Sequence, residues 1–210
     1  MKTWLKPVPM VILGLVGLCI LPELIIRLAP YSDFLRGRVY QNFAFWPGLL
    51  VDWQPNYFGQ PVLMFLTYGF LHAGLWHLLF NMMTLVSIGS PLVAELGQRR
   101  FAVLYILSQL GGAIGYAVLS TRPLPMVGAS GALFGLAGAL LWMRFRDDLE
   151  TISVWDTIED MFQPILMLIL LNVVMFFAMD GQLAWETHLG GAIAGAAAMG
   201  VLWRQAKHRS

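Results

Sequence analysis

The sequence predicts an all-α membrane protein, a bundle of six transmembrane helices with a long interfacial first loop. Two observations predict this class, the shortage of charged residues and the spacing of the apolar segments. Of the 210 residues, 58% are hydrophobic and 12% are charged, and the mean hydropathy is +0.69. A soluble domain carries roughly a quarter charged residues to solvate its surface. The composition therefore excludes a cytosolic enzyme.

Six apolar segments follow one another along the chain, each close to the ~20 residues that a helix needs to span a ~30 Å hydrocarbon layer. They cover residues 8–28, 73–92, 101–119, 127–143, 162–179 and 185–203. No internal repeat or appended soluble domain stands out between them. We therefore expect residues 1–210 to form a single membrane domain with its core at about 60–203.

The first segment, residues 8–28, is expected to be a retained membrane anchor. No small-x-small cleavage site follows it, which argues against a removed signal peptide. Cys19 is the single cysteine of the chain, so no internal disulfide can form. Glu23 and Arg27 are four residues apart near the end of the segment, where their side chains can pair.

The connection at residues 29–61 is too long for a tight turn and is rich in aromatic residues, which favour membrane interfaces. Its aromatic residues include Tyr40, Phe43, Phe45, Trp46, Trp53, Tyr57 and Phe58. We expect an interfacial loop in the outer leaflet.

The connection at residues 144–163 is acidic. It contains Asp147, Asp148, Glu150, Asp156, Glu159 and Asp160. We expect a solvated cytoplasmic helix or loop that takes no part in catalysis.

The positions of lysine and arginine predict the orientation, because these residues collect on the cytoplasmic side. With both termini on one side, that side holds Lys2, Lys6, Arg99, Arg100, Arg144, Arg146, Arg204, Lys207 and Arg209. The opposite side holds only Arg36, Arg38 and Arg122. Both termini are therefore predicted to be cytoplasmic. The net charge of +1 and the scatter of the basic residues give no sign of a nucleic-acid partner.

The head of the fourth segment carries Ser130 between Gly128 and Gly131. The glycines permit a tight turn and close backbone approach, which leaves the first N–H groups of the helix facing a developing anion. Placing a polar residue within the hydrocarbon layer of a membrane costs free energy, and such residues are usually retained for function. The alternative is a run of small residues that only lets helices pack closely.

The sixth segment carries His188 close to Gly190, Gly191 and Gly195. Glycines at this spacing let a helix approach its neighbour, so the imidazole can reach a group on another helix. A serine hydroxyl needs an adjacent base to become a nucleophile. A histidine that serves only packing is the alternative, but together the two residues favour a Ser130–His188 pair.

The start of the second segment carries a further polar group. His77 and Asn81 are four residues apart and so share one helix face, with His72 five residues earlier. A zinc site is the competing interpretation, but the HExxH pattern is absent and no carboxylate lies near in sequence. An aspartyl mechanism lacks paired aspartates within the segments, since Asp180 stands alone at a segment end.

Taken together, these motifs resemble those of the rhomboid family of intramembrane serine proteases. The resemblance rests on Gly128-Ala129-Ser130-Gly131, on an HxxxxHxxxN pattern from His72 to Asn81, on His188-Leu189-Gly190-Gly191 and on the order of six segments. It covers about residues 60–203.

The resemblance implies a role for each matching residue. Ser130 would be the nucleophile and His188 the base, a dyad without an acidic third member. His77 and Asn81 would hold the oxyanion together with the Ser130 N–H, and Phe134 would pack against the catalytic histidine. The family uses no metal and no cofactor, and its substrates are transmembrane proteins within the lipid bilayer.

The chain also departs from the family pattern. Many members carry Trp-Arg in the first loop, where this chain has Leu63 and Met64, and some have a further histidine at the position of Tyr68. The first change bears on loop anchoring and substrate entry rather than on the chemistry.

Two rival functions remain open at this stage. One is a non-catalytic, rhomboid-like protein that binds membrane clients, and the other is a small transporter. Against the transporter, the interiors of the segments lack charged residues apart from Glu23 and Arg27, which can pair with each other. The compact six-segment form resembles bacterial members and implies the inner (plasma) membrane of a bacterium. The sequence leaves the oligomeric state open.

Overall fold

The computed structural model of the chain describes residues 7–178 and 183–207, which are predominantly helical. The elements are α1 (Met10–Leu28), α2 (Ser32–Phe43), η1 (Pro47–Leu50), α3 (Gln60–Thr67), η2 (Tyr68–Phe70), α4 (Leu75–Leu119), α5 (Ser130–Thr151), α6 (Val154–Ala178) and α7 (Trp185–Lys207). An isolated antiparallel bridge joins Phe45 to Met126. The helical class predicted from the sequence is confirmed.

Helices lie on each of the six expected apolar segments, although their bounds differ. The second and third segments both lie within α4 and form two helical stretches that meet at a kink at Gly97, where φ is 75° and ψ is 160°. Glycine suits this break because it adopts positive φ without steric penalty. Within the described ranges, Met10–Leu28 and Leu75–Leu119 are long and apolar enough to cross a membrane. The count of six spans stays a prediction.

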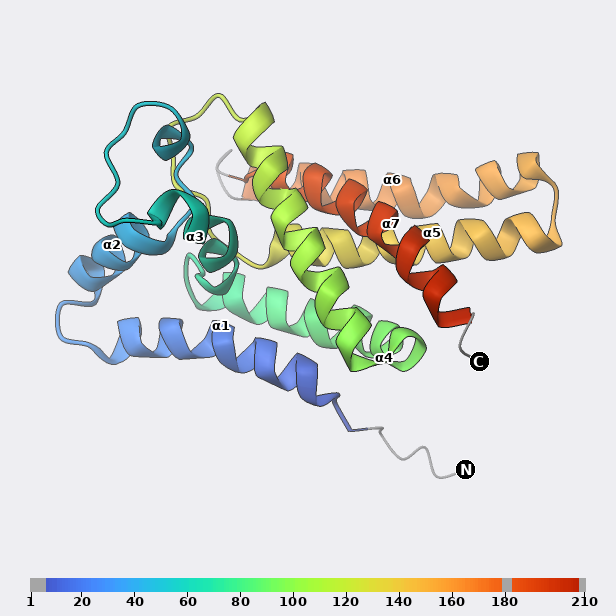
Figure 1. Cartoon of the computed structure of the whole chain (residues 1–210), viewed down its shortest axis with the longest axis horizontal. Helices are drawn as coiled ribbons and strands as arrows, with labels where there is room; N and C mark the ends of the chain where they lie inside the picture. Colours follow the sequence, from blue (N-terminus) through green and yellow to red (C-terminus); the bar gives the residue numbers. More distant parts are fainter. Residues whose placement is uncertain (1–6, 179–182, 208–210) are drawn as a thin grey trace.

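Helices α4, α5 and α7 pack against one another at the centre, with α1 against α4 and α6 against α5. Figure 1 shows α2 and α3 gathered at the end of the molecule where α4 begins. It also shows the start of α1, the bend in α4, the α5–α6 turn and the end of α7 directed toward the opposite end. The chain thus passes repeatedly between two ends.

Large apolar side chains lie outside the helices as well as between them. Leu85, Leu104, Leu136 and Met199 belong to the buried core shared by α1, α4, α5 and α7. The outer faces nevertheless expose many large apolar side chains, among them Leu21, Ile25 and Leu28 on α1 and Phe162, Met167 and Ile169 on α6. Exposed apolar surface of this extent is typical of a surface that meets lipid or a partner protein.

Glycine contacts bring α7 close to its neighbours. A Cβ atom added at Gly191 would overlap the backbone carbonyl of Gly131, and one at Gly195 would overlap that of Gly135. The backbones of α5 and α7 therefore touch directly. This close approach lies immediately after Ser130 on α5 and His188 on α7.

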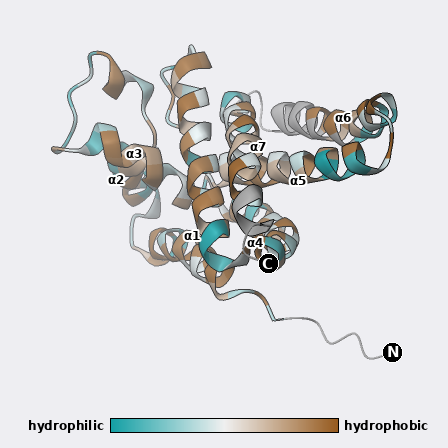
Figure 2. Cartoon of the chain, turned by 45° about the vertical axis from the view of Figure 1, so that its right-hand side comes forward, coloured by the Kyte–Doolittle hydropathy of each residue, from teal (hydrophilic) through white to brown (hydrophobic). Residues whose placement is uncertain are grey.

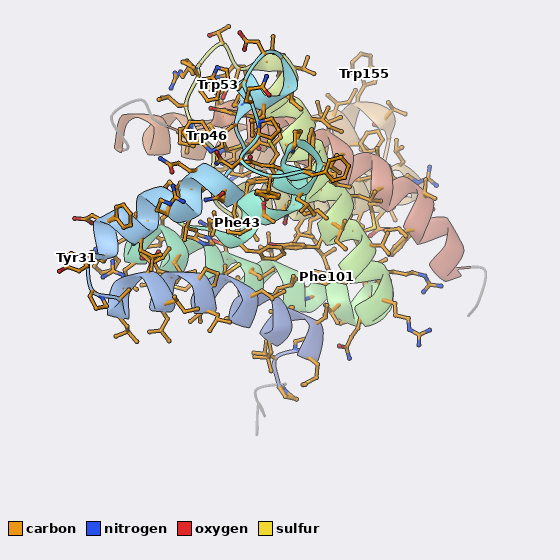
Figure 3. All side chains as sticks on the ribbon, turned by 60° about the vertical axis from the view of Figure 1, so that its left-hand side comes forward. Tyr31, Phe43, Trp46, Trp53, Phe101 and Trp155 are labelled. Carbon is orange, nitrogen blue, oxygen red and sulfur yellow. The ribbon has the colours of Figure 1, made fainter. Side chains whose placement is uncertain are left out.

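The segment at 29–61 contains structure of its own. Trp46 and Trp53 lie side by side, with ring centroids 5.6 Å apart (Figure 3). Phe45 differs from the expectation of an interfacial position, because it is fully buried against Met64 and Tyr68. The bridge to Met126 draws Phe45 inward.

The connection at 144–163 is mostly helical. Helix α5 continues to Thr151 and α6 begins at Val154. Figure 2 shows hydrophilic residues gathered at this junction. Two ion pairs, Arg144–Asp148 and Arg146–Glu150, connect successive turns of α5, so part of the negative charge is matched within the helix.

Candidate active site

The structure brings Ser130 and His188 together from two helices. Ser130 is the first residue of α5, and His188 lies in the first turn of α7. The Nε2 atom of His188 is 2.9 Å from Oγ of Ser130, within hydrogen-bonding distance. His188 is buried and Ser130 is half-buried. A hydroxyl and an imidazole in this geometry can exchange a proton directly.

Phe134 holds the imidazole of His188 from one side. The two rings are stacked, with centroids 4.2 Å apart and planes inclined by 5°. Phe134 lies four residues after Ser130, so both side chains come from the same face of α5. The stacking limits rotation of the imidazole.

His77 lies at the same site, and its ring orientation is set by a backbone hydrogen bond. The N–H of Ala73 donates to Nδ1 of His77 over 3.3 Å. Because a neutral imidazole carries one proton, Nε2 of His77 is then the protonated nitrogen and a donor. The ring also packs on Gly128, where an added Cβ would lie 2.7 Å from Cε1 of His77.

Asn81 lies one turn after His77 on α4, and its role at the oxyanion stays a prediction. Its side chain is buried, and Nδ2 donates to the backbone carbonyl of His77 over 2.7 Å. Asn81 is absent from the residues that line the cavity beside Ser130. In this structure its direct contact is thus with the backbone of His77.

The turn before α5 is held by the backbone of a distant segment. Gly128 has φ of 122°, and its N–H donates to the carbonyl of Tyr68 over 3.0 Å. Within α5 the N–H of Leu133 bonds the carbonyl of Ala129, so the N–H groups of residues 130–132 have no partner inside the helix. These N–H groups form the positive end of the helix beside the serine.

A cavity of about 220 Å³ opens over these groups. Ser130, His77 and His188 line it together with Tyr40 from α2, Tyr116 from α4 and the segment 122–127. Glu186 and Thr187, just before His188, also contribute to its wall.

Sequence reasoning anticipated the pairing of Glu23 with Arg27, which the structure confirms at 2.9 Å. It missed the second partner of that carboxylate, Arg36, whose guanidinium also lies 2.9 Å away. The sequence did contain a sign of this partner. Glu23 is a carboxylate in an apolar segment, and a buried charge requires an opposite charge beside it. It also missed Glu186 as a wall residue of the cavity.

In residues 7–178 and 183–207, no group of three or more histidine, cysteine, aspartate or glutamate side chains is placed to hold a metal ion. Asp180, weighed above in an aspartyl mechanism, lies outside the described residues.

Comparison with known proteins gives the family. The sequence model of the Rhomboid domain matches residues 60–205. The chain belongs to the rhomboid family. Members of this family are integral membrane proteins, which agrees with the exposed apolar faces of α1 and α6.

Individual relatives match the central part of this rhomboid chain. A segment of 134 residues is 34% identical to Rhomboid protease GluP of Bacillus subtilis (strain 168), covering 62% of this chain and 25% of that protein. A segment of 127 residues is 36% identical to RHOMBOID-like protein 5 of Arabidopsis thaliana, covering 60% of this chain and 39% of that protein. The matched part thus spans a quarter to two fifths of these two relatives.

The relatives differ in what their names state. A segment of 114 residues is 31% identical to Inactive RHOMBOID-like protein 8 of Arabidopsis thaliana, covering 51% of this chain and 32% of that protein. Rhomboids of similar relatedness therefore include both proteases and an inactive protein.

Proposed function

We propose that this rhomboid is an intramembrane serine endopeptidase that cleaves peptide bonds in or near the transmembrane segments of membrane proteins. The observation that carries the proposal is the 2.9 Å contact between Nε2 of His188 and Oγ of Ser130 in the wall of a cavity. A nucleophile beside its base is the arrangement that acyl transfer needs. The name Rhomboid protease GluP supports the same activity class.

The proposed reaction proceeds through an acyl-enzyme. His188 Nε2 takes the proton from Ser130 as Oγ attacks the carbonyl carbon of the scissile bond. The tetrahedral intermediate collapses, the C–N bond breaks, and the departing amine takes that proton from His188. A water molecule, deprotonated by His188, then attacks the carbonyl carbon of the ester. The bond from that carbon to Oγ breaks, Ser130 takes the proton back from His188, and the second product leaves with a free carboxyl group.

The oxyanion is proposed to be held by the Ser130 N–H and by Nε2 of His77. The hydrogen bond from Ala73 to Nδ1 of His77 supports this role, because it leaves the proton on Nε2. Gly128 gives the His77 ring the space to lie there. Asn81, which bonds the His77 backbone, is proposed to support the oxyanion group through His77. No metal or cofactor takes part in this scheme.

The membrane arrangement is part of the proposal. All six apolar segments are proposed to span the bilayer, with both termini cytoplasmic and residues 29–61 in the outer interface. Two observations support this topology. The bend in α4 and the α5–α6 turn lie at the same end of the molecule as the start of α1 and the end of α7 (Figure 1), and most lysine and arginine residues belong to the side that holds both termini. A bacterial inner membrane is an expectation from the compact form, and the matched relatives come from both a bacterium and a plant.

The deciding experiment is cleavage of a model transmembrane substrate in liposomes by the wild type, Ser130→Ala and His188→Ala. We expect cleavage by the wild type and none above background by either variant. A serine-directed fluorophosphonate should label the wild type but not Ser130→Ala. Full cleavage by either variant would refute the dyad.

The second candidate is a client-binding rhomboid without catalysis. The similarity to Inactive RHOMBOID-like protein 8 is the observation that favours it. In that case client binding would survive Ser130→Ala, and the wild type would neither cleave the substrate nor react with the probe.

A further inference from the structure

A charged cluster links α1 to the loop helix α2. Glu23 is 3% exposed within the apolar helix α1. Arg36 on α2 binds its carboxylate at two points, Nη1 to Oε2 at 2.9 Å and Nη2 to Oε1 at 3.0 Å. Arg27 binds Oε1 at 2.9 Å from the same helix. A paired guanidinium fork of this kind has one preferred geometry, so Glu23 fixes the position of Arg36.

The cluster extends to one backbone carbonyl. Nη1 of Arg36 also donates to the carbonyl oxygen of His72 over 3.0 Å. The hydroxyl of Tyr40, one turn later on α2, donates to the same oxygen over 2.8 Å. Two side chains of the first loop therefore hold a single acceptor just before α4.

That carbonyl belongs to the peptide group whose N–H binds His77. The peptide joins His72 to Ala73, and the Ala73 N–H is the donor to Nδ1 of His77. Donation to the oxygen of a peptide polarises the group and strengthens its N–H as a donor. The side chain of His72, itself buried, meets the His77 ring edge to face with centroids 5.1 Å apart.

We infer that Glu23, Arg36 and Tyr40 form a positioning relay that acts through the His72–Ala73 peptide to hold His77 with its proton on Nε2. The residues of the relay are positioning residues, because none of them has to touch the reacting atoms for this effect. The consequence for catalysis rests on the proposed function. The effect on the His77 ring does not.

The ion pair with Glu23 keeps the guanidinium of Arg36 in its charged form. The hydrogen bonds from the Glu23 carboxylate raise the pKa of Arg36 above its ordinary value. Arg36 therefore stays protonated. Leu63 and Met64 replace the Trp-Arg pair found in many rhomboids, and neither is a hydrogen-bond partner of this peptide. The relay thus supplies a polar connection from the first loop to the start of α4.

The test uses the full chain in detergent or liposomes, labelled with ¹⁵N-histidine. The chain has four histidines, so NMR signals can be assigned by replacing each in turn. In the wild type we expect His77 to carry its proton on Nε2. Arg36→Ala should give a mixture of the two His77 tautomers, and kcat should fall about fivefold to tenfold with KM unchanged, as for the loss of one or two hydrogen bonds. Arg36→Lys should restore part of the Nε2-protonated tautomer of His77 and part of kcat.

The chain offers two matched controls. Arg38→Ala removes an exposed cation from the same helix, and Arg27→Ala removes the other partner of Glu23 without touching the His72 carbonyl. Both should leave the His77 tautomer and kcat unchanged. If Arg36→Ala fails to fold, Tyr40→Phe carries the test, because it removes one donor to the same oxygen.

Two results would overturn the relay. One is an unchanged His77 tautomer in Arg36→Ala or, where that variant fails to fold, in Tyr40→Phe. The other is an equal change in Arg27→Ala, which would make the cluster a structural ion pair only. A wild type with the expected tautomer but without cleavage would refute the proposed function and leave the positioning of His77 standing.

Discussion

At the scale of single residues, both imidazoles of the site are oriented by neutral groups. Phe134 stacks on His188, and the Ala73 N–H binds His77. A carboxylate in the same place would have to be buried as a charge, which costs free energy unless it is paired. Aromatic stacking and a peptide donor orient the rings without that cost.

His77 and Asn81 should differ in their effect on the rate. Removing an oxyanion donor lowers kcat by roughly 10²–10³, so His77→Ala should show a loss of this size. Asn81→Ala removes one hydrogen bond to the His77 backbone, worth about 1 kcal/mol, and should lower kcat about fivefold. The measurement is kcat on a fluorogenic transmembrane substrate. Equal losses would place Asn81 on the oxyanion itself.

Phe134 should contribute through its ring. Stacked aromatic pairs are worth about 0.5–1.5 kcal/mol beyond the area they bury. Phe134→Leu should therefore lower kcat roughly twofold to tenfold, whereas Phe134→Tyr keeps the ring and should stay near the wild type. Cleavage rates and thermal unfolding should be measured for the same variants. A loss of stability that parallels the loss of kcat would assign the effect to packing instead.

At the scale of elements, the site depends on how closely α5 and α7 approach. The dyad bridges their first turns, and the Gly131–Gly191 and Gly135–Gly195 contacts follow directly. Small residues allow such contact between helices in membranes, where dispersion and packing replace the hydrophobic effect as the driving force. The same glycines that let the helices touch therefore set the Ser130–His188 distance.

A methyl group at this contact should separate the helices. A Cβ at Gly195 would overlap the Gly135 carbonyl, whereas one at Gly200 on the same helix would lie 3.5 Å from Trp142, an ordinary contact. Gly195→Ala should lower stability by about 1–3 kcal/mol and lower activity as well. Gly200→Ala should change neither. Thermal unfolding in detergent with a parallel cleavage assay checks both, and equal stability of the two variants would contradict the contact.

At the scale of the whole molecule, apolar surface covers the outside and polar groups gather inside and at the ends. Glu23, His72 and His188 are buried among the helices, while large apolar side chains of α1 and α6 face outward. A soluble protein would instead cover its outer helix faces with charged and polar side chains. In lipid, the exposed apolar faces carry no free-energy cost of contact with water. Burial among the helices keeps the polar groups out of contact with that lipid.

The proposed topology can be read by cysteine labelling. Cys19 is fully buried, so the natural thiol should not react. Ile152→Cys, at the exposed α5–α6 turn, should react with a membrane-impermeant maleimide only from the cytoplasmic side. Thr121→Cys, in the exposed segment after α4, should react only from the opposite side. Labelling of both from one side would refute the proposed number or direction of spans.

Apart from the Ser130–His188 pair, which motifs on two segments indicated, the features of the site that the sequence predicted are those encoded by spacing within one segment. His77 and Asn81 share a face because they are four residues apart, and Phe134 follows Ser130 by the same interval. The relay through Arg36 could not be predicted in this way. Its members come from α1, α2 and the start of α4, and no short-range pattern states which carbonyl a guanidinium will meet.

By itself the sequence determined the helical class, the membrane environment and the motifs of the rhomboid family, because apolar length and local periodicity are properties of consecutive residues. Tertiary structure alone decided that Phe45 is buried and that Arg36 meets the His72 carbonyl. It also decided the separation of Ser130 and His188, which are 58 residues apart in sequence. Such distances follow from how closely whole helices pack, and that depends on every contact between them.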